Sequence, residues 1–364
     1  SLDHGLVLAN SLTGIGTIDE AMGALNADGL FEQIIREPLT AARDLLIEYA
    51  NASEADKSEV AAGAEMLAKA RDAAAPAKAI FDVAVAKRLG VAIDDAWDAE
   101  QFAALAPMRE VREAVDPLQP AHMPYLFPEV FLRERPGFDV LVGNPPWETV
   151  KVEEQKWWGL RVPGLRAMKQ QERRSAMLGL FEQRPDLVAE YENDQRRTEA
   201  LSTAIRRGPY KLGAGDFDLY QAFAWRFWSL VRQGGRSAVV LPRAAFSGSP
   251  LEHWRRQVLA EGSFADVCFL QNKAEWIFRL PNGTRLTIGL GVIERGGASI
   301  ARFSGPFASE AEFLEGAGNL IAVPAEEFVD WSEIAAFPLM RDAMSGEVFM
   351  QMKRSPRFDA QYPG

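Results

Sequence analysis

The spacing of apolar residues predicts that the first third of the chain is helical. Residues 17–115 are rich in alanine, and their apolar positions recur every three or four residues, as at 39, 42, 45, 46 and 49. This spacing places apolar side chains on one face of each helix. Five prolines from residue 107 to residue 128 then interrupt the pattern, which predicts an irregular connection to the next part of the chain.

A different pattern follows this connection. Residues 140–142 are an unbroken apolar run, and we expect a strand that is buried on both faces, as in a parallel sheet with helices on each side. Residues 236–242 show the same pattern after a predicted helix over 215–235, whose end we place at Gly234 and Gly235. The two strands and the helix between them predict a crossover unit of a parallel sheet.

Two later segments predict a β-hairpin. Residues 264–271 and 284–295 have strand patterns, and the Pro-Asn-Gly sequence at 281–283 between them is typical of a turn. We expect this hairpin at an edge of the sheet. Beyond residue 305 the pattern weakens.

The first predicted strand ends in residues with unusual chemistry. Gly143 permits close approach by a backbone or a ligand, and the two prolines that follow Asn144 fix φ and lack N–H donors, so the loop is stiff and rich in free carbonyls. The Asn144 side chain and the Pro145 carbonyl are acceptors for the two N–H groups of an amine on a planar ring, and the Trp147 indole is a surface on which that ring stacks. Ligands of such sheets bind beyond the carboxyl ends of the strands. The alternative interpretation is an ordinary proline turn.

The sequence GFDVLVGNPPW (137–147) resembles the catalytic motif of the gamma-class adenine-N6 DNA methyltransferases, especially those of type IIG restriction-modification enzymes and phage-defence systems. PYLFPEVF (124–131) resembles the segment that precedes this motif in the family. The resemblance implies an α/β fold, namely a partial Rossmann-like class I methyltransferase sheet with helices on both faces, plus the α-helical insertion. It also implies S-adenosyl-L-methionine as cofactor, a flipped-out adenine of double-stranded DNA as substrate, and as catalytic residues Asn144, Pro145, Pro146 and Trp147.

The resemblance assigns roles to two further residues. Phe278 in EWIFRLPNGTRLTIGLGVI holds the position of a family phenylalanine that packs on the flipped base, with a core aromatic as the alternative. Asn10 ends a short predicted strand where the family has a polar residue, more often Asp, near the adenine of the cofactor. The family's glycine-rich cofactor loop has no counterpart before the motif, because Gly14-Ile-Gly16 lacks the acidic and proline context. We therefore expect a fragment with an incomplete cofactor site, inactive on its own.

The net charge of −11 disfavours DNA binding, but the charges are unevenly distributed. Residues 1–137 carry 12 Lys and Arg against 23 Asp and Glu, whereas residues 138–364 carry 28 of each. Residues 151–211, directly after the motif, hold 13 basic and 9 acidic residues. A phosphate backbone would lie near this stretch if a base entered the site, and a solvated helical face is the alternative.

Composition sets further expectations. With 48% hydrophobic residues the chain has enough apolar surface for a sizeable core. No run approaches the ~18 apolar residues of a membrane span, and no signal-peptide pattern opens the sequence, so we expect a cytoplasmic protein. Cys268 lies in an apolar stretch and is expected to be a buried small hydrophobe. His4, His122 and His253 lack the spacing of a zinc site or a catalytic triad, and we expect neither a metal nor covalent catalysis.

These interpretations divide the chain into a strand of the cofactor-binding half (1–16), the helical insertion with its proline-rich connection (17–137), the catalytic half (138–305) and a lead-in to a target-recognition region (306–364). The implied function is adenine-N6 methylation in a restriction-modification or phage-defence system, with a fused or associated nuclease and target-recognition domains. A cytosine-N4 methyltransferase makes the same chemical demands, although Ser or Asp is commoner there in place of Asn144. A protein glutamine presents similar geometry, and a non-catalytic nucleic-acid-binding or scaffold module is the alternative from another class.

Overall fold

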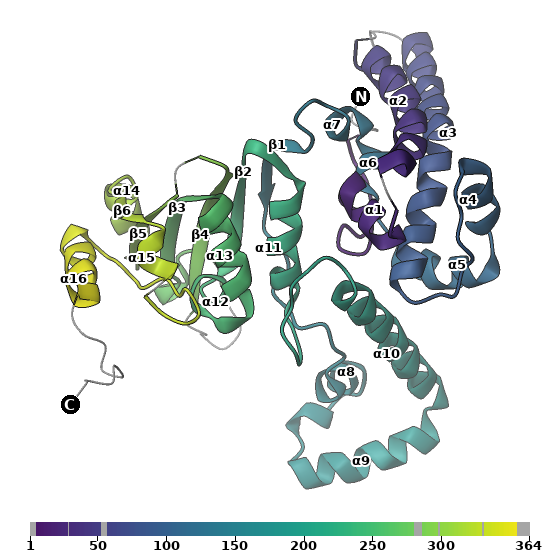
Figure 1. Cartoon of the computed structure of the whole chain (residues 1–364). Coiled ribbons are helices and arrows are strands. Elements are labelled where there is room, and N and C mark those ends of the chain that lie inside the picture. The colour runs from purple at the N-terminus through teal and green to yellow at the C-terminus, as the bar shows by residue number, and fades with distance from the viewer. Residues whose placement is uncertain are drawn as a thin grey trace, which may run out of the picture.

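The structure, a computed structural model, describes residues 5–27, 29–51, 57–279, 286–297, 299–329 and 331–354. Within these residues the chain forms a module of helices, a β-sheet with helices packed on it, and a group of helices that projects from the sheet (Figure 1). We call residues 18–115 the helical module. Residues 151–216, the projecting group, are the arm.

Six strands form the sheet in the order β1-β2-β4-β3-β5-β6 among the described residues. β1 is parallel to β2 and β3 is parallel to β5, whereas β4 runs antiparallel between β2 and β3, and β6 is antiparallel to β5. The fold is therefore a mixed α/β fold, and the predicted parallel pairing of the first two strands is confirmed. The strands are β1 (Phe138–Gly143), β2 (Val231–Pro242), β3 (Gly262–Gln271), β4 (Thr287–Arg295), β5 (Ile300–Phe307) and β6 (Ile321–Pro324).

One face of the sheet, the inner face, is covered by helices. Its side chains include Val239 and Leu241 of β2 and Val267 and Phe269 of β3, which are at most 4% exposed. They share one core with α11 (Leu219–Leu230), α12 (Ala244–Ser247) and α13 (Glu252–Glu261). Burial of each such side chain stabilises the fold by about 1.5–3 kcal/mol, so this face holds the sheet together.

The opposite face, the outer face, is only partly covered. Near β5, Cys268 and Phe307 share a cluster with Phe313 of α14 (Glu310–Gly316), which we call the outer-face cluster. Helices therefore lie on both faces of the sheet there. At the other end, Val140 and Val142 of β1 are 63% and 80% exposed. The prediction that this apolar run is buried on both faces was wrong. β1 is the outermost of the described strands on that side, and its outer face meets solvent.

β2 begins earlier than predicted. It directly follows α11, so Gly234 and Gly235 lie within the strand and do not end the helix. A Cβ on Gly235 would lie 2.9 Å from the carbonyl oxygens of Phe138 and Asp139 in β1, and the register between the two strands shifts beside this contact. Gly235 therefore permits close approach of two backbones at an irregularity in the ladder.

β3 and β4 pair as an antiparallel unit, which confirms the predicted pairing. The expected edge position was wrong, because β5 lies beside β3 and β2 lies beside β4. β5 directly follows the predicted hairpin, and the sequence analysis predicted no strand there. The predicted turn at 281–283 lies outside the described residues.

The helical module contains five α-helices among its described residues, as the apolar spacing predicted. α2 and α3 lie side by side (Figure 1), and Ile35 and Leu39 of α2 share a core with Ala77 and Ile80 of α3, all 0% exposed. The alanine-rich composition allows these helices to approach closely. The helices are α1 (Ile18–Leu25), α2 (Gly29–Asn51), α3 (Lys57–Arg88), α4 (Ala99–Leu105) and α5 (Arg109–Val115), followed by the short α6 (Met123–Leu126) and α7 (Pro128–Phe131).

A buried cluster of charges joins the helical module to α11, and we call it the junction. Glu20 of α1 accepts hydrogen bonds of 2.7 Å from Arg88 of α3 and from Arg226 of α11. Arg226 is 0% exposed and also donates to the Gly14 carbonyl at 2.9 Å. Burial alone would raise the pKa of Glu20, but the charges of the two arginines hold it below its ordinary value.

The arm has a small core of its own. Arg161 of α8 lies 3.8 Å from the centre of the Trp157 ring and donates hydrogen bonds to Glu190 of α10. The arm comprises α8 (Glu154–Arg161), the 3-10 helix η2 (Leu165–Ala167), α9 (Gln170–Gln183) and α10 (Pro185–Arg206). Its buried residues are Trp157, Trp158, Leu165, Met177 and Leu187.

Two further helices follow β6. They are α15 (Glu326–Val329) and α16 (Ala343–Arg354). Phe328 of α15 stacks on Phe349 of α16 with ring centres 5.6 Å apart, and both rings belong to the inner-face core. This part of the chain therefore packs on the same sheet.

Candidate functional site

Residues 144–147, the Pro-Pro loop, leave the sheet at the carboxyl end of β1. Asn144 and Pro146 are exposed, Pro145 is buried and Trp147 is half-buried. Among the described residues the Asn144 side chain has no hydrogen-bond partner. Its amide is therefore free to meet a ligand, while the catalytic role itself stays a prediction.

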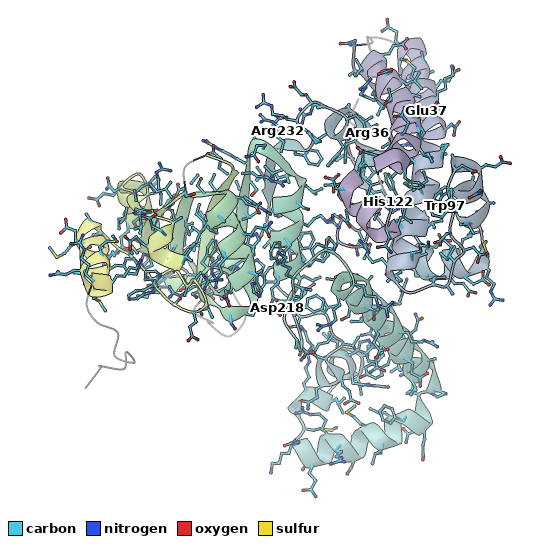
Figure 2. The ribbon with its side chains drawn as sticks, viewed as in Figure 1. Arg36, Glu37, Trp97, His122, Asp218 and Arg232 are labelled. Atoms are coloured by element: carbon cyan, nitrogen blue, oxygen red, sulfur yellow. The ribbon has the colours of Figure 1, made fainter. Side chains whose placement is uncertain are left out.

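The residues that follow the Pro-Pro loop are bonded to the start of α11. Thr149 Oγ1 donates a hydrogen bond of 2.6 Å to Asp218 Oδ1, and the two residues form an isolated antiparallel bridge. Figure 2 shows Asp218 where the arm meets the sheet. Two backbone hydrogen bonds flank this pair, from the Leu219 amide to the Glu148 carbonyl at 3.0 Å and from the Val150 amide to the Phe217 carbonyl at 3.2 Å.

Sequence reasoning did not single out Asp218. An aspartate directly before an apolar helical stretch indicates an N-cap, and Asp218 does hold the N-cap position of α11. Its carboxylate makes no capping bond to the helix and instead accepts the Thr149 hydroxyl. The aspartate therefore fixes the segment after the Pro-Pro loop.

The Trp147 indole is held at the end of the sheet. Its Nε1–H donates to the Val240 carbonyl of β2 at 3.3 Å. The side chain packs against both the inner-face core and the outer-face cluster. Because it remains partly exposed, it meets the geometric condition for a stacking surface, and it also contributes to packing.

Gly143 accommodates an aromatic ring of α11. A Cβ at this position would lie 2.7 Å from Cζ of Phe227. The close approach expected at this glycine is thus made by a side chain of the protein. A larger residue at 143 would separate β1 from α11 directly before Asn144.

Phe278 lies on a loop that reaches the same cluster as Trp147. Trp276 and Ile277 belong to the outer-face cluster, and Phe278 follows them with 37% of its surface exposed. Asn272, 3% exposed, shapes the loop through two hydrogen bonds. Its Nδ2 donates to the Phe278 carbonyl at 2.8 Å, and its Oδ1 accepts the Ile277 amide at 3.1 Å. Sequence reasoning did not single out Asn272, although it directly follows the predicted strand over residues 264–271.

Asn10 lies in a local turn. Residues 5–16 form no strand, so the strand predicted there was wrong, and Asn10 makes only an isolated bridge with Pro120. Leu6 and Leu8 before it are 74% and 99% exposed, because no described strand lies beside them. The Asn10 Oδ1 accepts the Leu12 amide at 3.0 Å. Its acceptor is thus engaged within the chain, and its predicted contact with a cofactor stays a prediction.

Gly14 and Gly16 accommodate atoms of the protein. A Cβ on Gly14 would lie 2.0 Å from the Ala121 carbonyl oxygen, and one on Gly16 would lie 1.8 Å from a guanidinium nitrogen of Arg226. Atoms of the protein therefore occupy the space beside each glycine, and the incomplete S-adenosylmethionine site stays a prediction.

The site has few ionisable groups. Cys268 is buried, as expected, and burial raises the pKa of its thiol. The described residues contain no group of three or more His, Cys, Asp and Glu side chains placed to hold a metal ion. The Pro-Pro loop thus offers neutral hydrogen-bond acceptors and an aromatic face.

The fold and the loop define a mixed α/β sheet protein with an acceptor-rich proline loop at the end of a strand. No family model and no curated protein matches the chain. Among solved structures it is similar to the ATP-dependent Type ISP restriction-modification enzyme LlaBIII bound to DNA, with 12% sequence identity and a TM-score of 0.24. The similarity covers 96% of this chain and 21% of that one, so the chain spans about a fifth of the enzyme's length. A TM-score this low supports no conclusion about function.

No helix among the described residues combines the length and the apolar character that crossing a membrane requires.

Proposed function

We propose that this chain is the catalytic half of a DNA methyltransferase that methylates the N6 amine of adenine in a flipped-out base. The Pro-Pro loop carries the proposal. An exposed Asn144 that has no partner among the described residues, two prolines and a half-buried Trp147 follow one another at the carboxyl end of β1. The resemblance of residues 137–147 to the adenine-N6 motif supports the same reaction.

The task of these residues is to orient a neutral amine. The nitrogen lone pair of the adenine amine is conjugated with the ring. If Asn144 Oδ1 and the Pro145 carbonyl accept its two hydrogens, the lone pair is turned towards a methyl donor. The methylated amine would then release one proton to water, and since neither acceptor changes its own protonation state, the step needs no group of tuned pKa on this chain.

The base itself would lie between two aromatic side chains. Trp147 and Phe278 are both partly exposed, and their loops meet in the outer-face cluster. Stacking of a base on an aromatic side chain contributes about 1–3 kcal/mol. The proposed substrate is double-stranded DNA. Because the target atom is inaccessible inside a duplex, one base has to be extruded from it.

We further propose that S-adenosyl-L-methionine is the methyl donor and that this chain supplies only part of its site. The longer protein would act in the cytoplasm in a restriction-modification or phage-defence system, together with nuclease and target-recognition domains. Calorimetric titration of the isolated chain with S-adenosylmethionine should show weak binding or none. A dissociation constant in the low micromolar range, about −8 kcal/mol, would show that the site is complete.

Substitution of Asn144 in the full-length protein tests the reaction. Asn144→Ala removes one positioned acceptor and should lower the methylation rate by on the order of 10²-fold or more. DNA affinity should change little, because phosphate contacts dominate it. Methyl transfer to a labelled duplex and binding to the same duplex are the two measurements.

Asn193→Ala is the matched control, since Asn193 is an exposed asparagine on α10. It should leave both the rate and the affinity unchanged. Equal losses of rate and affinity in Asn144→Ala would instead make Asn144 a structural residue.

A cytosine-N4 methyltransferase is the closest alternative, because that amine makes the same demands on the two acceptors. Duplexes in which either all adenines or all cytosines of both strands lack the exocyclic amine separate the two reactions. Methyl transfer that survives loss of the adenine amines would contradict adenine specificity. Complete absence of transfer by the full-length protein, with DNA binding retained, would favour the non-catalytic module.

A further inference from the structure

We propose that the arm binds the phosphate backbone of duplex DNA through basic side chains on α8, on α9 and on the turn that precedes α9. This inference rests on the proposed function and names the surface that holds its substrate. We call Lys156, Lys169 and Arg174, together with the joint, the arm surface. The joint is the pair of hydrogen bonds by which Arg173 connects Gln155 and Met168. Three observations lead to this surface: the distribution of charge, the construction of the joint, and the place where the arm is attached.

Positive charge is concentrated in one half of the arm. Residues 154–184 contain seven Lys and Arg against three Glu, a net charge of +4. Residues 185–206, which form α10, contain three Arg against five Asp and Glu, a net charge of −2. In a chain of net charge −11 this separation within one small unit gives the segment from α8 to the end of α9 a net positive charge.

The cations of this half differ in how they are used. Arg161 and Arg184 are each paired with carboxylates of α10. Lys156, Lys169 and Arg174 are exposed and their side chains form no ion pair among the described residues, and the same holds for Arg166 of η2. The backbone amide of Lys169 donates to the Glu172 carboxylate at 3.3 Å. Unpaired cations keep their full charge for a ligand, whereas paired ones would first have to give up their partners.

One arginine connects the segments that carry Lys156, Lys169 and Arg174. Arg173 of α9 donates to the Gln155 side chain of α8 at 2.8 Å and to the Met168 carbonyl after η2 at 2.9 Å. Lys156, Lys169 and Arg174 are the neighbours in sequence of Gln155, Met168 and Arg173. The joint thus ties together the three segments that carry these cations, beside a groove of about 290 Å³ between α8 and α9 that Arg174 lines together with Glu154.

The joint is built on a packed core, so its cations start from an ordered frame. Trp157 and Trp158 of α8 lie with ring centres 5.0 Å apart, and both are within 6 Å of the Tyr191 ring of α10. The Trp157 Nε1–H donates to Asp194 at 2.8 Å. An ordered frame reduces the entropy that is lost when the surface binds.

The base of the arm connects it to the candidate site. The arm leaves the sheet after the Pro-Pro loop and returns at Asp218, and the Thr149–Asp218 bond closes its base. Figure 1 shows α8, α9 and α10 extending from this point away from the sheet, with α9 at the far end. A duplex with one base in the site would therefore have to extend along the arm for its phosphates to meet the cations of α8 and α9.

Duplex binding by the chain tests the proposal. The probe is a fluorescein-labelled DNA duplex of about 30 base pairs, and its anisotropy is titrated at several salt concentrations, since each phosphate contact adds about 0.9 to the slope of log K against log salt. The triple variant Lys156→Gln, Lys169→Gln, Arg174→Gln should weaken binding at about 0.1 M salt by on the order of 10²-fold and lower the slope by about two to three.

The matched control removes the same charge elsewhere. Arg71, Arg135 and Arg341 are exposed and carry no carboxylate partner among the described residues, and their triple change to Gln should weaken binding less than about threefold with the slope retained. Equal effects of the two triple variants, or a wild-type chain without salt-dependent duplex binding, would overturn the proposal. Preference for a single strand of the same sequence would also overturn it, because the surface would then not be one for a duplex.

The outcome is separable from that of the proposed reaction. Asn144→Ala should leave the salt slope unchanged. If the arm variant keeps the slope while Asn144→Ala abolishes methylation, the arm surface is wrong and the reaction stands. If the arm variant loses the slope but the full-length protein transfers no methyl group, the surface stands and the reaction is wrong. Tryptophan fluorescence of the arm core reports whether the variant is folded.

Discussion

The junction and the Pro-Pro loop both connect the sheet to helices, but they do so by opposite chemistry. At the junction, the Glu20 carboxylate lies between Arg88 and Arg226 and pairs with both of them, so one negative charge faces two positive charges in the interior. Around the Pro-Pro loop, hydrogen bonds without an ion pair anchor the segment from Trp147 to Thr149, while Asn144 remains exposed and unpartnered among the described residues. The first arrangement uses its carboxylate within the fold, and the second leaves an amide free for a ligand.

This difference separates structural polar residues from functional ones. A buried charge with all its partners in place is costly to disturb and has nothing to offer a ligand. An exposed amide next to rigid prolines contributes little to stability and can be replaced without unfolding the chain. The free energy of unfolding of single variants therefore provides a direct test of the comparison.

The largest effect is expected at the junction. Glu20→Gln removes the charge that balances two buried arginines while it keeps the shape of the side chain. We expect the free energy of unfolding in urea to fall by about 3–5 kcal/mol, since an uncompensated buried charge remains.

Glu65→Gln is the control, because Glu65 makes an exposed ion pair with Lys69 on α3. Its substitution should leave the urea midpoint nearly unchanged. A similarly small shift for Glu20→Gln would mean that water reaches the junction and that the comparison with the Pro-Pro loop fails.

An intermediate effect is expected for Trp147. The ring packs against two clusters but is only half-buried, so Trp147→Ala should cost about 2–3 kcal/mol, less than the 3–5 kcal/mol of a fully buried tryptophan. The fluorescence rise of 2-aminopurine at the target adenine should shrink in the same variant, since stacking is lost. A loss of stability in the upper range together with unchanged base flipping would leave Trp147 with a packing role alone.

A smaller effect, visible only as a pH dependence, is expected at His122, which Figure 2 shows within the helical region. Its Nδ1 accepts the Ile15 amide at 3.1 Å, and its Nε2–H faces Asp82 Oδ1 at 2.9 Å, so the ring is neutral. Burial lowers the pKa of His122, although Asp82 opposes this shift.

Below about pH 6.5 the unfolded chain therefore gains a proton that the folded chain does not gain. The free energy of unfolding should be constant above that pH, and at lower pH it should decrease by at most about 1.4 kcal/mol per pH unit. The carboxylates of Glu20 and Asp82 have lowered pKa values and affect stability only at more acidic pH. Urea unfolding between about pH 5 and pH 7.5 should show this slope in the wild type and not in His122→Gln. A slope that persists in the variant would point to another group.

The local pattern of the sequence was sufficient to place four strands and most helices, because those elements depend on spacing within a few residues. The Pro-Pro loop was found for the same reason, since its chemistry is contiguous. The exposure of Val140 and Val142 was not predictable, because it depends on which strand lies at the edge of the sheet. Gly234 and Gly235 suit a helix stop and a bulge equally well.

The supports of the site were missed because they act across long stretches of chain. Thr149 meets Asp218 after an excursion of 69 residues, and Trp147 reaches Val240 across 93. Asn272 acts locally, but its role depends on burial, which a single polar residue in a sequence does not reveal. Without these contacts the sequence indicates which residues meet a ligand and not what holds them.

The open side of β1 has a consequence for how the chain behaves at high concentration. Among the described residues β1 pairs only with β2, so its other edge presents unpaired N–H and C=O groups beside the exposed Val140 and Val142. Its carboxylate, Asp139, is neutralised by Arg232 and Arg133, which hold its pKa at about 2. Charged edge residues and prolines are the usual protection against edge-to-edge pairing, and this six-residue strand has neither an unpaired charge nor a proline. We therefore expect light scattering to rise steeply with the concentration of the isolated chain, and a flat profile would show that this edge is covered.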